Sequence, residues 1–166
     1  MVVDMKAKIK LDSFDIKILR ELQMDGALSN QDLADRVGLT AAPCSRRVKN
    51  LEESGVIADR VVRIDERKIN LNMIVLLNIS MDKHIPERFE TFEKTVKEIP
   101  EVLECYVITG NTADYQLKVA VPDLENYYDI LLGKITRIEG VTGVHSSFIL
   151  RKVIDSTALP LGYINQ

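Results

Sequence analysis

The sequence predicts an α+β fold with a helical N-terminal part and a C-terminal part that alternates strands and helices. Two patterns of apolar residues lead to this prediction. Before residue 57, apolar residues recur three and four apart and glycines interrupt the pattern, which is typical of short amphipathic helices. After residue 73, short runs rich in β-branched residues alternate with two helical segments, which is typical of a domain built on one sheet.

Composition places the chain among ordinary globular proteins. Of its 166 residues, 46% are hydrophobic and 28% are charged, and the formal net charge is −3. No apolar run approaches the ~18 residues that a membrane helix needs, and the first residues lack the apolar core of a signal peptide. We therefore expect a cytoplasmic protein that does not associate with membranes. A disulfide between Cys44 and Cys105 is possible, but reduced thiols are expected in that compartment.

Helix-capping residues mark the start of two helices in the N-terminal part. Asp12 can cap a helix that runs to about Gln23, along which apolar residues recur four apart on one face. Ser29 can cap a second helix, and Asp32 three residues later completes a variant of the capping box. Because Gly38 ends this second helix, the sequence predicts two short helices followed by a glycine turn.

A proline near the start of the next segment is compatible with a third helix. With Thr40 as the N-cap, Pro43 is the third helical residue, where the backbone N–H has no partner within the helix to lose. Cys44, Val48 and Leu51 then share one face, which we expect to be buried. Cys44 is accordingly predicted to be a small core residue rather than a redox or metal-binding group.

The second and third helices together predict a helix-turn-helix motif at residues 30–49. The face of the third helix opposite Cys44 is small at its start and basic further along, and Arg36–Leu51 contains four basic residues and no carboxylate. Small residues let a helix enter the major groove, and longer polar side chains beside them reach bases and phosphates. We therefore expect this face to bind double-stranded DNA, although a solvated surface has the same pattern. The candidate DNA-binding residues are Thr40, Ala42, Pro43, Ser45, Arg46, Arg47, Lys49 and Asn50.

Arg47 occupies a position between the buried and exposed faces of the third helix. It can reach a DNA phosphate, or it can pair with an acidic neighbour such as Glu21 or Asp35. The sequence leaves both interpretations open.

The remaining segments predict a two-domain organisation. Residues 57–65 alternate apolar and polar side chains, which predicts a strand leading out of a winged-type helix-turn-helix domain at residues 11–72. A second domain at residues 73–154 has its elements in the order β-α-β-β-α-β, the ferredoxin-like arrangement, and a tail at 155–166 follows. The predicted strands are 73–82, 102–110, 115–121 and 141–154, and the predicted helices are 85–100 and 124–140.

The predicted strands carry apolar residues in both of their alternating registers. Examples are Ile74, Leu76, Ile79, Val119 and Val121. In this arrangement the helices cover one face of the sheet, so apolar residues on the other face need a separate cover. We expect a second copy of the chain to supply it, which makes the protein a homodimer.

Three stretches of this chain resemble the leucine-responsive regulator/asparagine regulator (Lrp/AsnC) family of bacterial and archaeal transcription factors. They are LDSFDIKILRELQMDGALSNQDLADRVGLTAAPCSRRVKNLEESGVI at the front, TGNTADY before the third strand of the sheet, and STALPL at residues 156–161. The resemblance implies a DNA-binding half at residues 11–72 and an effector-sensing half, called the RAM domain, at about 74–150. It also implies dimers that assemble into tetramers, octamers or larger rings, and an amino-acid effector bound between dimers.

The resemblance also implies where an effector binds. The implied residues are Gly110, Asn111, Thr112, Ala113 and Asp114. Gly110 permits close approach of the backbone to a ligand and Asp114 can hold an ammonium group. The alternative is a hairpin turn in which Asp114 accepts hydrogen bonds from backbone N–H groups. This turn has one residue more than the common form of the family, and we expect the extra residue to alter the shape of the pocket.

Two other functions fit the same architecture less well. Some haem-pathway decarboxylases share it, but the chain has only His84 and His145, and it lacks a P-loop, a nucleophile elbow and a metal-ligand cluster. We therefore expect no enzymatic activity, no metal and no cofactor other than a possible amino-acid effector. A small-molecule sensor that does not bind DNA is the second alternative, and the basic third helix argues against it.

Overall fold

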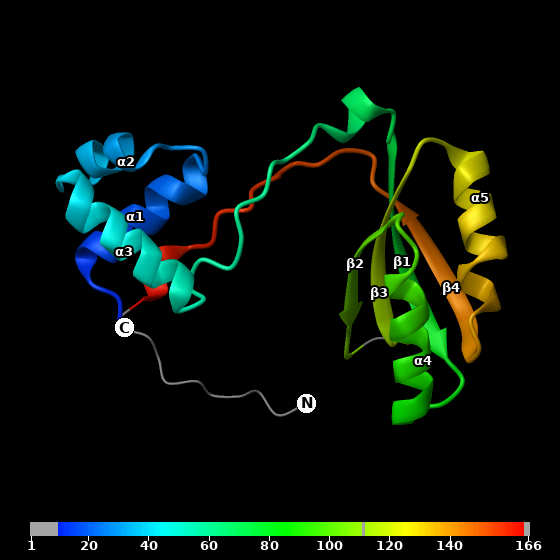
Figure 1. Cartoon of the computed structure of the whole chain (residues 1–166). Coiled ribbons are helices and arrows are strands. Elements are labelled where there is room, and N and C mark those ends of the chain that lie inside the picture. The colour runs from blue at the N-terminus through cyan, green and yellow to red at the C-terminus, as the bar shows by residue number, and fades with distance from the viewer. Residues whose placement is uncertain (1–9, 111, 165–166) are drawn as a thin grey trace. The chain divides into compact units, whose positions relative to one another are not determined.

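The computed structural model describes residues 10–110 and 112–164, which divide into two compact units (Figure 1). Of the described residues, the first unit comprises 10–63 together with 154–164. The second unit is Ile64–Val153. The C-terminal residues therefore fold with the N-terminal helices, which the sequence did not predict.

The first unit contains the three predicted helices. They are α1 (Ser13–Met24), α2 (Asn30–Val37) and α3 (Ala41–Glu53). The Asp12 carboxylate accepts hydrogen bonds from the N–H groups of Phe14 and Asp15, and the Ser29 hydroxyl accepts from that of Asp32, so both predicted N-caps are confirmed. Gly38 ends α2 in the left-handed region at φ 76°, a conformation that glycine adopts without steric cost.

The start of α3 confirms the interpretation of its proline. The Cys44 N–H donates to the carbonyl of Thr40 at 3.2 Å, so Pro43 lies in the first turn, before any intrahelical bond it could break. The side chain of Thr40, by contrast, makes no capping hydrogen bond. Cys44, Val48 and Leu51 are buried with residues of α1 and α2, as expected.

The predicted strand at residues 57–65 is wrong. This segment has no ladder partner in the described chain and leads into a 3₁₀ helix at Glu66–Ile69. Alternating side chains favour a strand only where a second edge is available to pair with it. Here Val61 and Val62 are 79% and 89% exposed, and Arg63 instead bonds to Asp155 at 2.7 Å.

The C-terminal tail packs on the helices of the first unit. Leu161 and Ile164 contact its hydrophobic core, and Leu161 begins a short 3₁₀ turn that ends at Tyr163. The amide of Gln23 holds the tail in two directions, because its oxygen accepts from the Leu159 N–H at 2.6 Å and its nitrogen donates to the Leu159 carbonyl at 3.2 Å.

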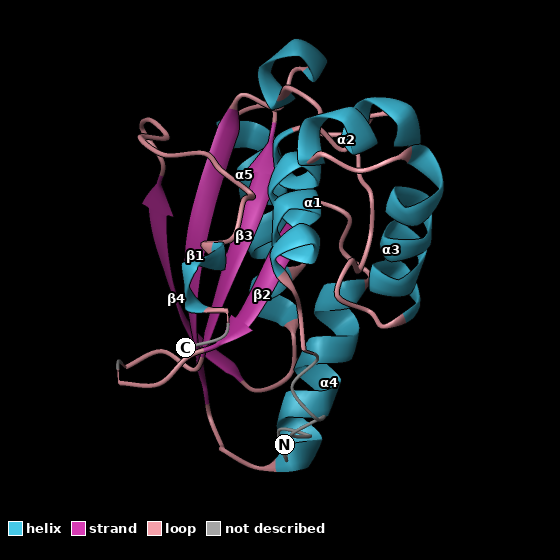
Figure 2. Ribbon diagram, turned by 90° about the vertical axis from the view of Figure 1, so that its left-hand side faces the viewer, coloured by secondary structure: helices cyan, strands magenta, loops and turns pink. Residues whose placement is uncertain are grey.

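The second unit confirms the β-α-β-β-α-β order. All strand pairs are antiparallel, and the order across the sheet is β2-β3-β1-β4, with the strands side by side in Figure 2. One hydrophobic core joins α4 and α5 to the sheet, so the two helices cover the same face. The elements are β1 (Met73–Met81), α4 (Pro86–Lys97), β2 (Val102–Val107), β3 (Tyr115–Val121), α5 (Leu124–Gly133) and β4 (Val141–Phe148).

Four elements are at least three residues shorter than predicted. The strand predicted at 102–110 ends at Val107 and the helix predicted at 85–100 spans Pro86–Lys97, while the last strand and the last helix lose more. The final strand ends at Phe148, whose ladder partner is Val75, and one further bond joins the Ile149 N–H to the Ile74 carbonyl. The second helix ends at Gly133, a poor helix former, and a 3₁₀ turn follows at Ile135–Arg137.

The face of the sheet away from the helices is more polar than the sequence suggested. Ile79, Val119 and Val121 belong to the core under the helices, so they are no evidence for a second apolar face. On the opposite face, next to Ile74 and Leu76, polar side chains bond to one another across the strands. These bonds are Gln116 to Asn78 at 3.1 Å and Lys118 to Glu104 at 2.7 Å.

Candidate DNA-binding and effector sites

The helix-turn-helix is held together by a small contact region between α2 and α3. Leu33, Ala34 and Val37 of α2 are buried, and Ala34 is fully so, which lets the two helices approach closely. At the start of the motif, the Asn30 amide donates to the Ser45 hydroxyl at 3.4 Å. The motif therefore fixes α3 through its buried side and leaves its other side free.

The free side of α3 presents the predicted polar residues. Thr40, Ala42, Arg46, Lys49 and Asn50 are exposed, whereas Pro43 and Ser45 are half-buried. Among the residues that the structure describes, Arg46 has no hydrogen-bond or ion-pair partner. The Lys49 ammonium lies 3.6 Å from the Glu53 carboxylate, but both side chains are largely exposed, so this pair is weak.

Arg47 pairs with two carboxylates that the sequence analysis did not name. Its Nη1 donates to Asp12 at 2.7 Å and to Asp15 at 2.8 Å, and its guanidinium lies 5.5 Å from the centre of the Phe14 ring. These hydrogen bonds raise the pKa of Arg47, first through Asp15 and then through Asp12. The pKa of Asp12 is lowered by the Asp15 backbone N–H and by Arg47, against the opposing effect of desolvation.

The two acidic partners proposed for Arg47 are engaged elsewhere. Glu21 accepts from Arg36 at 3.3 Å, and Asp35 accepts from the Gln31 amide at 3.1 Å. Arg47 therefore ties α3 to the start of α1, and the basic character of the free side comes from Arg46 and Lys49.

The predicted effector residues lie in the turn between β2 and β3. Asn111 is outside the described residues, so we call Gly110, Thr112, Ala113 and Asp114 the effector loop. Gly110 has φ 86°, Thr112 is exposed and Ala113 is buried. The Ser80 hydroxyl donates to the Thr112 carbonyl at 2.9 Å, which connects the loop to the end of β1.

Both carboxylate oxygens of Asp114 already accept hydrogen bonds. Oδ2 accepts from the Met81 N–H at 2.7 Å, which agrees with the hairpin alternative. Oδ1 lies 2.6 Å from Nε2 of His84, a contact that the sequence analysis missed. In the structure β1 pairs with β3, so His84, which follows β1, comes close to Asp114, which precedes β3. The predicted order of elements did not by itself state this pairing. The Asp114 side chain is 17% exposed and that of His84 is 69% exposed.

Metal binding, membrane insertion and a disulfide can each be checked in the described residues. No group of three or more His, Cys, Asp or Glu side chains among them could hold a metal ion. Within the same residues, no helix is both long and apolar enough to cross a membrane. Both cysteines are free, with Cys44 buried and Cys105 exposed.

Family comparisons match both units. A model of the Lrp/AsnC ligand binding domain matches residues 74–159, and a model of a winged helix-turn-helix DNA-binding domain matches residues 11–58. The Bkd operon transcriptional regulator of Pseudomonas aeruginosa is 41% identical over 152 residues, which are 92% of this chain and 99% of the relative. The leucine-responsive regulatory protein of Escherichia coli is 34% identical over 149 residues, 90% of each chain.

Solved structures agree with these matches. A transcriptional regulator of Neisseria meningitidis in complex with L-Met has a TM-score of 0.89 and 35% identity, covering 92% of this chain and 98% of its own. An AsnC family transcriptional regulator of Agrobacterium tumefaciens has a TM-score of 0.87 and 40% identity, covering 93% and 99%.

Fold, helix-turn-helix and relatives together define a DNA-binding transcription regulator with a ligand-binding domain. The chain belongs to the Lrp/AsnC family. The relatives are regulators rather than enzymes, so the expectation of no enzymatic activity is confirmed and the decarboxylase alternative is not supported.

Proposed function

We propose that this regulator binds a specific DNA sequence through the free side of α3 and changes its DNA affinity when an amino acid binds the effector loop. It acts in the cytoplasm as a homodimer or a larger assembly of dimers. The observation that carries the proposal is the division of α3, where the unpaired Arg46 and the weakly paired Lys49 are exposed opposite the buried Cys44 and Val48.

The start of α3 suits entry into the major groove. Thr40, Ala42 and Pro43 are short enough for close approach, and the first N–H groups of the helix favour a phosphate nearby. Ser45, Arg46 and Asn50 are placed to reach base edges, and Lys49 is placed to reach a phosphate. Arg47 keeps α3 at its angle to α1 through Asp12 and Asp15, so it positions the reading residues rather than reading bases itself.

A single protomer has few free cations for phosphates, which favours a dimer. Arg36 and Arg47 are neutralised by carboxylates, so Arg46 and Lys49 are the principal free cations of the face. Two protomers that read two half-sites double the phosphate contacts, and their symmetry predicts a palindromic operator. Leu76, half-buried on the face of the sheet away from the helices, is the proposed apolar part of the dimer interface.

The effector loop offers one carboxylate to the ammonium group of an amino acid. Oδ2 of Asp114 holds the end of β1, so the structure depends on it, whereas Oδ1 is occupied only by the exposed His84. An incoming ammonium can therefore replace the imidazole at Oδ1 without loss of the Met81 bond. The related regulator of Neisseria meningitidis in complex with L-Met supports an amino acid as the class of ligand.

Two measurements test this function. A gel-shift assay with the upstream region of the regulator's own gene should show a complex at low salt, and the complex should weaken as salt rises. No shift at low salt, with or without amino acids, contradicts DNA binding by this face. A screen of melting temperature with the twenty amino acids should find at least one that stabilises the protein, because a ligand stabilises the state it binds.

A further inference from the structure

The two helices that cover the sheet have different outer faces. Both α4 and α5 bury one side in the same hydrophobic core. Apart from one proline, the exposed positions of α4 are polar and carry charges of both signs; they are Pro86, Glu87, Glu90, Thr91, Lys94 and Lys97. The exposed positions of α5 instead include three large apolar side chains, which is not the pattern of a helix face that meets only water.

The three apolar side chains of α5 form one stripe. Leu124, Tyr128 and Leu132 follow one another at intervals of four residues and are 50%, 54% and 54% exposed. At 3.6 residues per turn they lie within about 80° of one another around the helix. Single exposed apolar residues are ordinary, whereas a contiguous group marks a contact surface. We call these three residues the α5 stripe.

One flank of the α5 stripe is acidic. Glu125 and Asp129 are each one residue beyond a member of the stripe, a rotation of about 100°, and both are exposed. Among the residues that the structure describes, neither has an ion-pair partner. Helix α5 contains no basic residue, and Lys134 directly after it is held by Glu101 at 3.0 Å. The flank therefore carries negative charge that the described chain leaves uncompensated.

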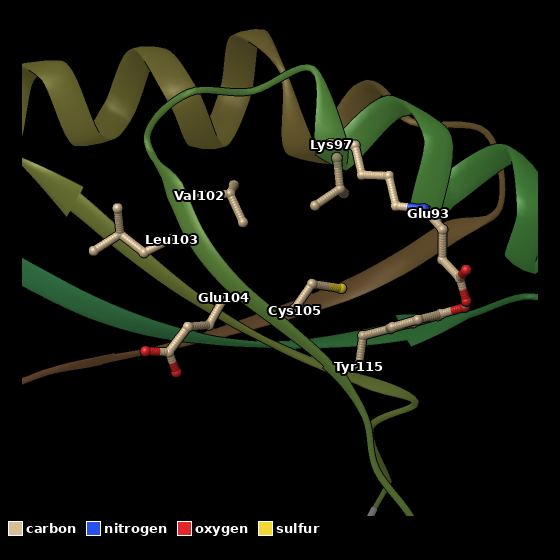
Figure 3. A pocket seen from close by; sticks show the side chains of 8 residues that line it. Glu93, Lys97, Val102, Leu103, Glu104, Cys105 and Tyr115 are labelled. Atoms are coloured by element: carbon tan, nitrogen blue, oxygen red, sulfur yellow. The ribbon is translucent and has the colours of Figure 1, made fainter. Parts of the chain in front are cut away.

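The groove beside α4 does not offer a comparable apolar surface. Figure 3 shows this groove between α4 and β2, with Glu93, Lys97 and Cys105 among the residues that line it. Val96 and Tyr115 at its floor are 2% and 0% exposed, so a partner cannot reach them. Of the two helices, α5 is therefore the one that presents accessible apolar side chains.

The charges disfavour a second copy of α5 as the occupant of the stripe. In an antiparallel pair of α5 helices, a twofold axis perpendicular to both helices keeps the two acidic flanks on the same side of the contact. The Asp129 carboxylates of the two copies would then lie near each other, and like charges at such positions are destabilising. A complementary occupant carries basic residues along that border instead.

We propose that the outer face of α5 binds a basic amphipathic helix of another protein. Apolar side chains of that helix, three and four residues apart, lie along the α5 stripe. Lys or Arg side chains on one of its borders pair with Glu125 and Asp129. This inference goes beyond the proposed function, because it adds a protein partner at a surface separate from α3, from the effector loop and from Leu76.

A synthetic peptide tests the match of charge. The probe has about 18 residues, long enough to form a helix, with leucines three and four apart and lysines along one border. Fluorescence anisotropy of the labelled peptide with the full chain should show binding at low salt that weakens as salt rises. The same peptide with glutamate in place of lysine should bind at least roughly tenfold more weakly, because like charges then meet. Equal binding of the two peptides, or no binding of the basic one, overturns the proposal.

Three variants of the protein locate the peptide on α5. Leu132→Ser should weaken binding of the basic peptide roughly tenfold, as loss of an apolar anchor does. Glu125→Gln together with Asp129→Asn should weaken it roughly fivefold at low salt. Glu87→Gln together with Glu90→Gln removes the same charge from the exposed side of α4 and should leave binding unchanged. Equal losses in the two double variants would indicate attraction to an acidic protein in general and would contradict the proposal.

The mass of the assembly excludes or identifies a second copy at this surface. Leu132→Ser should have the same mass as the parent by light scattering and the same affinity for DNA. A smaller assembly in this variant would show that the α5 stripe joins copies of the chain, which would also overturn the proposal. Because the proposed DNA and amino-acid sites do not include α5, failure of this inference leaves the proposed function intact.

Discussion

The free side of α3 and the effector loop are both short polar surfaces, but different contacts determine their geometry. On α3, helix periodicity determines which residues are exposed, because burial of Cys44 and Val48 on one side leaves the opposite side in solvent. In the effector loop, residues distant in sequence decide the geometry, because Asp114 is held by Met81, the last residue of β1, and by His84, which follows that strand. A periodic pattern therefore predicts the first surface, whereas the second depends on which strands pair.

The same difference appears between two adjacent arginines. Arg46 is free because helix periodicity turns it outward, whereas Arg47 is engaged because α1 brings Asp12 and Asp15 to it. Charge alone therefore does not identify a DNA contact. We therefore propose as DNA contacts only those basic residues that the packing of the helices leaves without a close carboxylate.

The largest effect is expected for removal of both free cations of α3. Arg46→Ala together with Lys49→Ala should weaken specific DNA binding, at about 1–3 kcal/mol for each base contact that is lost. Each lost phosphate contact should also flatten the dependence of log K on log salt by about 0.9. Binding is measured by titration at several salt concentrations, with Arg20→Ala on α1 as the control. Unchanged affinity in the double variant would show that another face reads the DNA.

A smaller effect is expected in the effector loop, where one long-range contact is replaced. Asp114→Asn removes the charge that we propose holds a ligand ammonium, and it should lower the affinity for the stabilising amino acid by about 1.5–3 kcal/mol, the range for hydrogen bonds to charged groups. His84→Ala should act in the opposite direction, because it frees Oδ1. Calorimetric titration of both variants measures this, and equal affinities in the two would contradict the replacement of His84 by the ligand.

Most of the fold could be predicted because its determinants are local. Three helices were predictable from the caps at Asp12 and Ser29, from Gly38 and from the period of the apolar residues. Four strands were predictable from runs of β-branched residues. The segment at residues 57–65 was predicted wrongly, because its alternation is real but the described chain offers no strand to pair with it. Packing of the C-terminal tail on α1 was not predictable, since the sequence of a short apolar tail does not indicate which surface of the protein it contacts.

The candidate sites could be predicted only in part for the same reason. The exposed residues of α3 followed from the position of Pro43, which fixed the helical register. The partners of Arg47 did not follow, because they depend on the angle between α1 and α3.

Substitution of Cys44 should lower the stability of the fold moderately, without a direct effect on DNA binding by the exposed side of α3. Cys44→Ser places a hydroxyl among apolar residues, which costs about 1–3 kcal/mol when no partner is available. The free energy of unfolding should fall by this amount, while DNA affinity at a temperature where the variant is folded should stay that of the parent. Denaturant unfolding measures the loss, with Ser13→Ala at an exposed position of α1 as the control. A stability equal to that of the parent would place Cys44 outside the core.

The smallest effect is expected from the pH dependence of the Asp12 carboxylate. Its pKa is lowered in the folded state by the Asp15 backbone N–H and by Arg47, so ionised Asp12 stabilises the fold above its ordinary pKa of about 3.9. That contribution is lost as pH falls through the lowered pKa. In Asp12→Asn the asparagine still caps α1 but no longer titrates, so the variant should lose less stability than the parent between about pH 5 and pH 2. Thermal melts across this range measure the difference, and parallel curves would show that Asp12 has the same pKa in the folded and unfolded chains. Because half of the Asp12 side chain is exposed to solvent, the difference should shrink further in high salt.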